Sequence, residues 1–381
     1  MKITNLRIYY LIVSSNNLWF ITSSWLFYWL KFMSIKDVGL IDSLAFFIGI
    51  MFEFPSGIIS DKFGRKITLI FSQALQFIGS LIITLATSGF EIGLGFIIFQ
   101  LGVSLFSGTI ESFGYESSVS ENENYEKTLI KSSSLSTTSY LISLLIGGYL
   151  YTVNNNYPNI LWTLNYLFGF LISFFIIKSF KAASVNETFN VKNIASKMDI
   201  KVILYLLFFL SVCFAFDYGF LKLVILDKFS DYSNNYFYIV IASLLGIALS
   251  NFLLKKDLNL LNSLRTGYFS LCLLFLFSFV SKQLNIVVFF LFSFFVIYSN
   301  QLFLKYINQR ISDNERAGVI SFFSFLFKFP YVLLALYFGM SLQTEDTSML
   351  FWYLGLSMLV LYLGVKFASK LRYNSLFEKG A

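Results

Sequence analysis

Several ionisable side chains lie inside long apolar stretches of this sequence, where they could take up and release protons or contact a polar ligand. These residues are Asp42, Glu53, Glu111, Glu116, Asp217, Lys222 and Lys328. In a lipid bilayer an ionisable side chain costs roughly 2.5 kcal/mol or more, unless it is paired or faces water. They are therefore the first candidates for a functional site.

The composition indicates a membrane protein and excludes several kinds of chemistry. Of the 381 residues, 57% are hydrophobic and 13% are charged, against roughly 45–50% and about 25% in soluble domains. The absence of His excludes His-based triads and removes the commonest zinc ligand. Cys213 and Cys272 both lie in apolar stretches, so no disulfide framework is expected. We expect no metal, no cofactor and no enzymatic activity.

Twelve apolar stretches are long enough to cross a bilayer as helices, which takes about 20 residues each. They are residues 8–30, 37–60, 67–88, 92–118, 132–152, 158–179, 201–223, 235–254, 262–281, 285–306, 317–340 and 348–368. A polar linker at 181–200 divides them six and six. The sequence therefore predicts an all-α membrane protein with two pseudo-symmetric six-helix bundles, residues 1–180 and 201–381.

The positive charges indicate the orientation of these helices. Cytoplasmic loops retain Lys and Arg, and most basic residues fall on cytoplasmic segments if the N-terminus is placed inside. Both termini are then cytoplasmic, and the net charge of +7 reflects topology, so no nucleic-acid partner is expected. Short loops and the absence of disulfides favour a bacterial cytoplasmic membrane.

The loop between the second and third stretches carries a motif. It reads Glu53-Phe-Pro-Ser-Gly-Ile-Ile-Ser-Asp-Lys-Phe-Gly-Arg-Lys66, and it resembles the signature loop of the major facilitator superfamily. The Glu-x-Pro-x-Gly part resembles a subset of that superfamily rich in exporters. The segment 108–117 is similar to a second pattern of the superfamily, with Glu116 replacing Asp. The resemblance implies a conformational latch formed by Gly57, Asp61, Lys62, Gly64, Arg65, Lys66 and Glu116.

The same resemblance implies that spans one, four, seven and ten line a central cavity. The cavity residues expected on these spans are Asn16, Asn17, Trp19, Glu111, Asp217, Asn300 and Gln301. Hydrogen bonding between helices is the alternative role for the amides. For Tyr28 and Trp29 we favour the aromatic belt at the membrane interface.

Glu111 is the main candidate for a proton switch, with Glu53 and Asp217 as further proton-coupling candidates. A carboxyl group whose access to water changes as a cavity opens and closes takes up a proton in one state and releases it in the other. The alternative is a structural carboxylate bonded to Tyr115 or Arg65.

A second hypothesis pairs Glu53 with Lys328 across the two bundles. Their depths in the membrane differ by roughly one helical turn, which long side chains can cover. In the alternative interpretation, Lys328 reaches toward the interface and Glu53 caps a kink at Pro55.

Together these features favour a secondary active transporter that works by alternating access. No nucleotide-binding loop is found, so an ion gradient is the expected energy source. We expect a proton-coupled antiporter for efflux of a small amphipathic or hydrophobic compound. The alternative is an importer of a nutrient or metabolite with the same fold. A non-transporting membrane protein is less favoured. The expected partners are the substrate, protons and the lipid bilayer, and the protein is expected to be a monomer.

Overall fold

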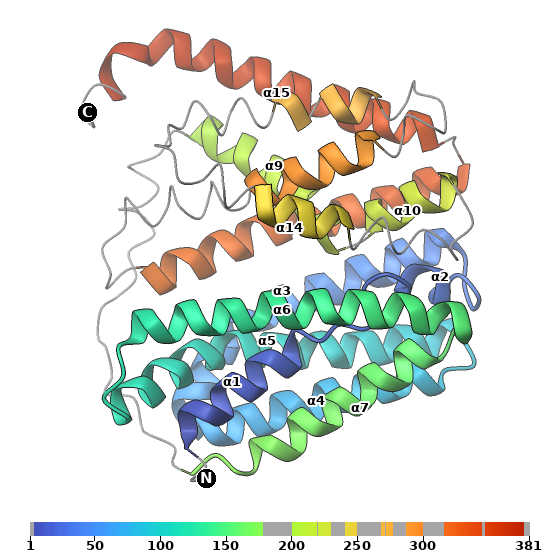
Figure 1. Cartoon of the computed structure of the whole chain (residues 1–381). Helices are drawn as coiled ribbons and strands as arrows, with labels where there is room; N and C mark the ends of the chain where they lie inside the picture. Colours follow the sequence, from blue (N-terminus) through green and yellow to red (C-terminus); the bar gives the residue numbers. More distant parts are fainter. Residues whose placement is uncertain are drawn as a thin grey trace. The chain divides into compact units, whose positions relative to one another are not determined.

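The computed structural model describes residues 4–177, 200–218, 220–229, 241–249, 268–270, 272–276, 287–299, 316–344 and 347–376 (Figure 1). The chain divides into two compact units. One comprises Met1–Asn186 with Leu223–Val240, and the other Glu187–Lys222 with Ile241–Ala381. Most of the predicted linker at 181–200 lies outside the described residues.

The first unit is a bundle of five long helices and two shorter ones, within the residues that the structure describes. The long helices are α3 (Ile35–Phe63), α4 (Arg65–Leu85), α5 (Gly89–Ser120), α6 (Tyr125–Val153) and α7 (Tyr157–Ser173), and the shorter ones are α1 (Asn5–Asn16) and α2 (Trp25–Trp29). Helix α5 packs against α3 and α4, α4 packs against α7, and α1 packs against α6 and α7. Within the described part of the chain, α4 and α5 are long and apolar enough to cross a membrane by length and composition.

In the second unit, α9 (Ile200–Tyr218) packs against α14 (Arg316–Thr344) and α15 (Thr347–Leu376). Aromatic rings fill the contact with α14: the rings of Phe214 and Tyr331 lie 4.9 Å apart. The short helix α10 (Phe220–Phe229) follows α9 along the chain, and the division between the two units falls within it, after Lys222. The described segment Val287–Ser299 is a further apolar helix, and it contacts α9 through Phe216 and Phe292.

Polar residues in the short loops determine where the helices begin. The hydroxyl of Ser34 accepts a hydrogen bond from the backbone N–H of Asp37 and caps α3. At α5, Ser88 and Glu91 form a capping box, in which each side chain accepts from the other residue's backbone N–H. Such caps satisfy amide groups that the first helical turn leaves unpaired.

Small residues allow α4 and α5 to pack closely. A Cβ atom on Gly79 would lie 2.6 Å from the carbonyl oxygen of Gly95, and one on Gly102 would lie 2.8 Å from the carbonyl oxygen of Ser72. Membrane helices associate largely through such close backbone contact. These glycines therefore allow the α4–α5 pair to form the centre of the first unit.

The first predicted span is not one continuous helix. Helix α1 ends at Asn16 and α2 begins at Trp25. Side chains take over the hydrogen bonds lost at the break. The Asn17 amide donates to the carbonyl of Val13 at 2.8 Å, the Trp19 indole donates to the carbonyl of Asn16 at 2.8 Å, and the Thr22 hydroxyl donates to the carbonyl of Trp19 at 2.7 Å.

The broken segment is enclosed by its own unit, because Phe20 to Ser24 are all buried. Non-helical backbone at membrane depth is tolerated only where protein or water surrounds it. The prediction that Tyr28 and Trp29 belong to an interfacial belt is wrong, because both side chains are buried within the unit, at 2% exposure each. The Tyr28 hydroxyl donates to the carbonyl of Ile83, and the Trp29 ring packs against Phe96.

Gly147 on α6 is expected to be essential for this packing. A Cβ atom at this position would overlap the carbonyl oxygen of Phe20 in the broken segment. We expect Gly147→Ala to lower the free energy of unfolding by roughly 1–3 kcal/mol, because the backbone must move to relieve the overlap. The measurement is thermal unfolding of the purified protein in detergent. Gly364→Ala is the matched control, because a Cβ there has open space around it; equal losses in both variants would contradict the expectation.

Candidate functional site

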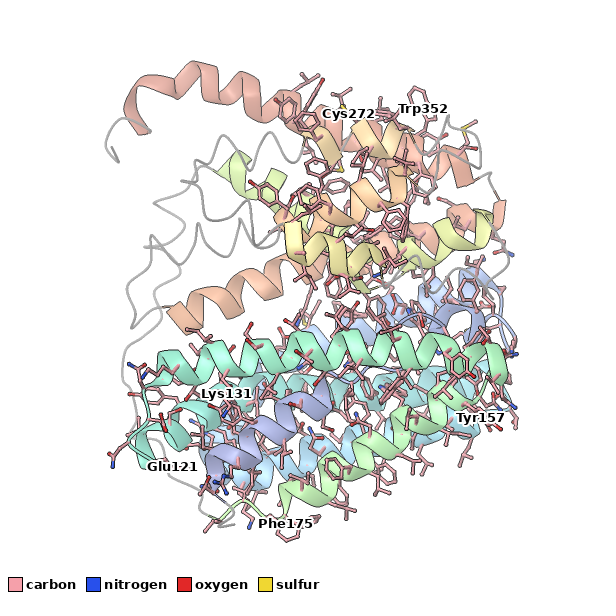
Figure 2. All side chains as sticks on the ribbon, in the orientation of Figure 1. Glu121, Lys131, Tyr157, Phe175, Cys272 and Trp352 are labelled. Carbon is pink, nitrogen blue, oxygen red and sulfur yellow. The ribbon has the colours of Figure 1, made fainter. Side chains whose placement is uncertain are left out.

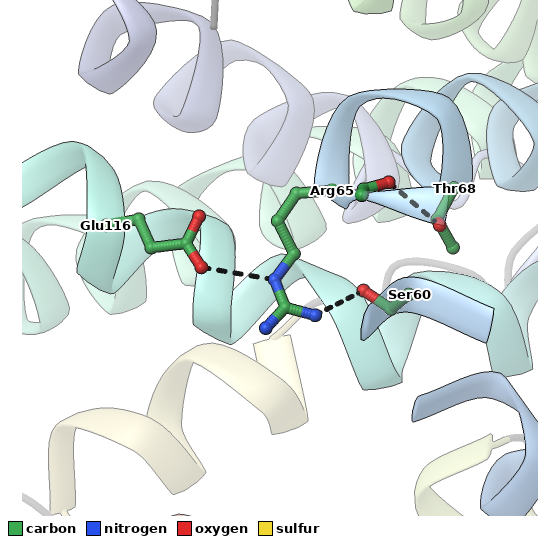
Figure 3. A network of polar contacts seen from close by, with 5 residues as sticks. Ser60, Arg65, Thr68 and Glu116 are labelled. Atoms are coloured by element: carbon green, nitrogen blue, oxygen red, sulfur yellow. Dashed lines mark hydrogen bonds and ion pairs between the residues drawn. The ribbon is translucent and has the colours of Figure 1, made fainter. Parts of the chain in front are cut away.

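The motif between α3 and α4 forms a buried ion pair (Figure 3). The Nε of Arg65 lies 3.2 Å from Oε1 of Glu116 on α5. The Nη1 of Arg65 donates to the hydroxyl of Ser60 on α3 at 2.6 Å. The exposed fractions of the two charged side chains are only 7% and 15%. Arg65 therefore joins three helices at one point.

Gly64 makes this arrangement possible because it lies between the end of α3 and the start of α4 with a φ of 86°. Glycine adopts this left-handed backbone conformation without the steric cost that other residues meet. The hydroxyl of Thr68 donates to the carbonyl of Gly64 at 3.1 Å and stabilises the turn. The sequence analysis assigned Arg65, Gly64 and Glu116 to one latch but missed Ser60.

Other residues of the motif have different surroundings. The Lys66 ammonium donates to the carbonyl of Ile176 at 2.6 Å, beyond the end of α7. Lys62 is exposed, with its ammonium 5.7 Å from the centre of the Phe63 ring. Gly57 and Asp61 lie within α3, and their contacts with other residues are outside what the structure describes.

Two more contacts near this end of the first unit bind the start of α1. Oε1 of Glu121, just after α5, accepts a hydrogen bond from the backbone N–H of Leu6 at 3.0 Å. The side chain of Asn5 accepts from the backbone N–H of Ile177 at 2.9 Å. Together with Lys66, they connect the start of α1 and the start of α4 to the ends of α5 and α7.

Glu111 has a different environment from Glu116, although both lie on α5. Its side chain is exposed, on the same face as Ser107 and Tyr115. Among the residues that the structure describes, Glu111 has no hydrogen bond and no ion pair. The Arg65 guanidinium, one of its two expected alternative partners, is bound to Glu116. A carboxyl group on an open helix face is free to exchange protons or contact a ligand.

The two cavity amides expected on the first span make hydrogen bonds within the first unit. Asn16 is buried and donates to the carbonyl of Ile12 at 3.3 Å, while Asn17 is partly buried and donates to the Ser136 hydroxyl on α6 at 3.2 Å. The Trp19 ring packs edge-on against Phe99 at 5.9 Å. Asn300 and Gln301 lie outside the described residues.

In the second unit, Asp217 and Lys222 lie on either side of the junction between α9 and α10. Asp217 is exposed, whereas Lys222 is buried with an exposed fraction of 3%. The Lys222 ammonium donates to the backbone carbonyl of Asp217 at 3.3 Å and lies 5.7 Å from the centre of the Phe216 ring. The sequence analysis recognised Lys222 as a deep charge but did not include it in the site.

Lys222 is expected to be kept for function rather than for stability. Among the described residues, the Lys222 ammonium has one carbonyl at 3.3 Å, one ring face and the charge of the exposed Asp217 side chain, which together are weak compensation for its burial. We therefore expect Lys222→Met to leave the melting temperature unchanged or raise it, and to reduce transport. Thermal unfolding and transport are measured on the same preparation. A fall in melting temperature of several degrees would show that Lys222 stabilises the fold instead.

Glu53 and Lys328 belong to different units, and their pairing stays a prediction. Glu53 lies in α3 with its side chain partly buried, and its backbone carbonyl accepts from the Ser56 hydroxyl at 2.6 Å. Lys328 is partly buried in α14.

The helical architecture and the signature loop define one class of protein. Residues 9–335 match the family described as Major Facilitator Superfamily. The chain belongs to this superfamily. The predicted fold class is confirmed: an integral membrane protein of 12 transmembrane helices in two bundles.

Two curated relatives match part of the chain. One is an uncharacterised MFS-type transporter, YxaM, from Bacillus subtilis (strain 168), 30% identical over 166 residues. The other is an uncharacterised transporter from Buchnera aphidicola subsp. Schizaphis graminum (strain Sg), 35% identical over 166 residues. The matches cover 42% of this chain and 40% and 39% of the two relatives.

Solved structures share the fold over nearly the whole chain. The nucleoside transporter NupG has a TM-score of 0.73 at 12% identity, covering 94% of this chain and 96% of that one. A D-xylose-proton symporter has a TM-score of 0.68 at 13% identity, covering 93% and 95%. At these identities the likeness shows the fold and not the substrate.

Proposed function

We propose that this protein is a secondary active transporter that couples the efflux of a small amphipathic or hydrophobic compound to proton entry. The observation that carries the proposal is Glu111, an exposed carboxyl group with no partner among the described residues, on the helix formed by the fourth predicted span. An ionisable side chain left open in a membrane helix is expensive and is usually functional. Asp217 and Glu53 are further candidates for the proton path.

The proposed latch is the buried pair of Arg65 and Glu116 at the junction of α3, α4 and α5. A conformation that holds an ion pair with so little exposure loses much of its stability when one partner is removed or displaced. We propose that this ion pair stabilises one of the two alternating conformations. In this proposal both termini lie on the cytoplasmic side. The linker 181–200 is also cytoplasmic and connects a bundle of residues 1–180 to a bundle of residues 201–381. The transporter acts as a monomer.

The direction of transport has two candidates. Efflux is favoured by the Glu53-x-Pro55-x-Gly57 resemblance to an exporter-rich subset. Import is favoured by one of the structural neighbours, which is named as a D-xylose-proton symporter. Exporters and importers of this superfamily share one fold, so the fold itself does not separate them.

The deciding experiment is a substrate screen in proteoliposomes with an imposed pH gradient. Amphipathic compounds, nucleosides and sugars are tested with the gradient in each direction. An exporter moves its substrate against the proton flow, and a symporter moves it with the flow. Absence of gradient-driven movement for every compound, from protein that is shown to be folded, would overturn proton-coupled transport of these substrate classes.

A further inference from the structure

Four tyrosines from three helices gather at one end of the first unit. The rings of Tyr9 and Tyr10 on α1 have centroids 5.5 Å apart. The rings of Tyr115 on α5 and Tyr125 at the start of α6 lie 5.2 Å apart and nearly perpendicular. Tyr115 is exposed at 54% and Tyr10 and Tyr125 are partly exposed, whereas Tyr9 is buried against Phe113 and Gly114.

Glu111 belongs to the same cluster. It lies one helical turn before Tyr115, so the two side chains share a face of α5. The Tyr9 ring of α1 lies directly against Gly114 of α5, and the Tyr125 ring at the start of α6 lies against Tyr115, so α1 and α6 both contact α5 within about one turn of Glu111. The cluster is therefore a carboxylate among tyrosine rings, with accessible ring surface on three helices.

A cation of the chain itself already uses one of these rings. The Lys131 ammonium on α6 lies 4.5 Å from the centre of the Tyr10 ring. Figure 2 shows Lys131 near the same end of the unit as Glu121, while Tyr157 lies at the other end. Within the described residues Lys131 makes no ion pair with Glu111. The Tyr10 ring face is thus able to hold a positive charge, and the Glu111 carboxylate is able to pair with a second cation.

We propose that Glu111, Tyr10, Tyr115 and Tyr125 form a binding site for an organic cation, with Tyr9 as its buried wall. Aromatic faces attract ammonium and related cations through the ring quadrupole, and a nearby carboxylate adds charge complementarity. An entering cation pairs with Glu111 and competes with Lys131 for the Tyr10 ring. This inference deepens the proposed function by naming the substrate class. Transport of the organic cation rests on the proposed function, whereas binding of the cation does not.

The chemistry of the cluster separates this ligand from others. An organic anion would be repelled by the Glu111 carboxylate and by the electron-rich ring faces, and the Lys131 ammonium alone would attract it. A metal ion would need several oxygen, nitrogen or sulfur ligands. The described residues contain no group of three or more His, Cys, Asp or Glu placed to hold a metal. A flat or bulky amine fits both the carboxylate and the rings.

The test measures binding of tetraphenylphosphonium to the purified full-length protein in lipid nanodiscs, by calorimetry. We expect Glu111→Gln to weaken binding roughly tenfold or more, and Tyr115→Leu to weaken it roughly three- to tenfold. Glu123→Gln and Tyr149→Leu are matched controls, because both residues are exposed and lie outside the cluster. Their affinities should equal that of the unaltered protein.

Lys131→Gln provides a test in the opposite direction. It removes the resident cation from Tyr10 and lowers the local positive charge, so tetraphenylphosphonium should bind roughly two- to fivefold more tightly. A variant that merely damages the fold weakens binding and does not strengthen it. Thermal unfolding of every variant checks that the fold is retained.

The outcomes separate this inference from the proposed function. Specific binding that Glu111→Gln weakens and Lys131→Gln strengthens supports the site, even if no pH-driven transport of the cation is seen; in that case coupled transport of this cation fails. No binding by the unaltered protein, or equal binding in Glu111→Gln and Glu123→Gln, overturns the site even if other compounds are transported.

Discussion

Replacing Glu111 by Gln is expected to reduce proton-driven transport to the level of protein-free liposomes. The amide has the shape of the carboxyl group but cannot take up or release a proton. Because the Glu111 side chain is exposed and has no hydrogen bond or ion pair with the residues described, the substitution should leave the fold intact. The measurement is substrate movement in proteoliposomes under an imposed pH gradient, with thermal unfolding as the check of integrity.

Glu123→Gln serves as the control for this experiment, since it removes an exposed acid from the loop that follows α5. It should transport at the unaltered rate. Full gradient-driven activity in Glu111→Gln would remove Glu111 from the coupling mechanism, and Asp217 and Glu53 would then be the next candidates.

Breaking the Arg65–Glu116 pair is expected to have the largest effect on stability. Removing one partner of a buried ion pair takes a charged contact away from the other at a site with little water, which costs roughly 3–5 kcal/mol. We expect Arg65→Gln to approach this loss. Ser60→Ala removes only one hydrogen bond to Arg65 and should lower the free energy of unfolding by about 1–2 kcal/mol. Chemical unfolding in detergent measures both.

A double-mutant cycle isolates the pair. Arg65→Gln, Glu116→Gln and the double variant should show a coupling free energy of roughly 1–3 kcal/mol, because the residues are in direct contact. Lys62→Gln is the control for loss of a basic residue from the same loop, and its exposed side chain should contribute little. Additive losses from Arg65 and Glu116 would show that the contact does not act as a latch.

Glu111 and Glu116 lie on the same helix but on different faces, and this separates the two experiments. Five residues at 3.6 per turn place the two side chains about 140° apart around α5. Glu116 therefore points to the buried junction with α3 and α4, while Glu111 lies on the open face with Tyr115. A displacement of α5 would move Glu111 and Glu116 together. It would therefore couple the Arg65–Glu116 latch to the surroundings of the Glu111 carboxyl group.

The break in the first span shows where sequence reasoning is limited. Residues 8–30 are apolar enough to be taken for one helix, yet α1 ends at Asn16. A local signal was present in the pair Asn16–Asn17 and in Thr22-Ser23-Ser24, whose side chains compete for backbone hydrogen bonds. Whether these side chains end the helix depends on the burial of the segment and on the space for the Phe20 backbone. That space is left by Gly147, which lies on another helix, α6.

The sequence alone determined the membrane class, the helical fold and the superfamily, because these follow from hydrophobic length and from a motif whose residues are close together in the chain. It also placed Gly64 in the signature loop, and the structure shows that this glycine adopts the positive φ of the turn between α3 and α4. Only the tertiary structure decided that Arg65 pairs with Glu116 and Ser60, that Tyr28 is buried, and that tyrosines of three helices gather at the end of the first unit that holds Glu111. Those contacts join residues far apart in sequence, and their distances depend on how the helices pack.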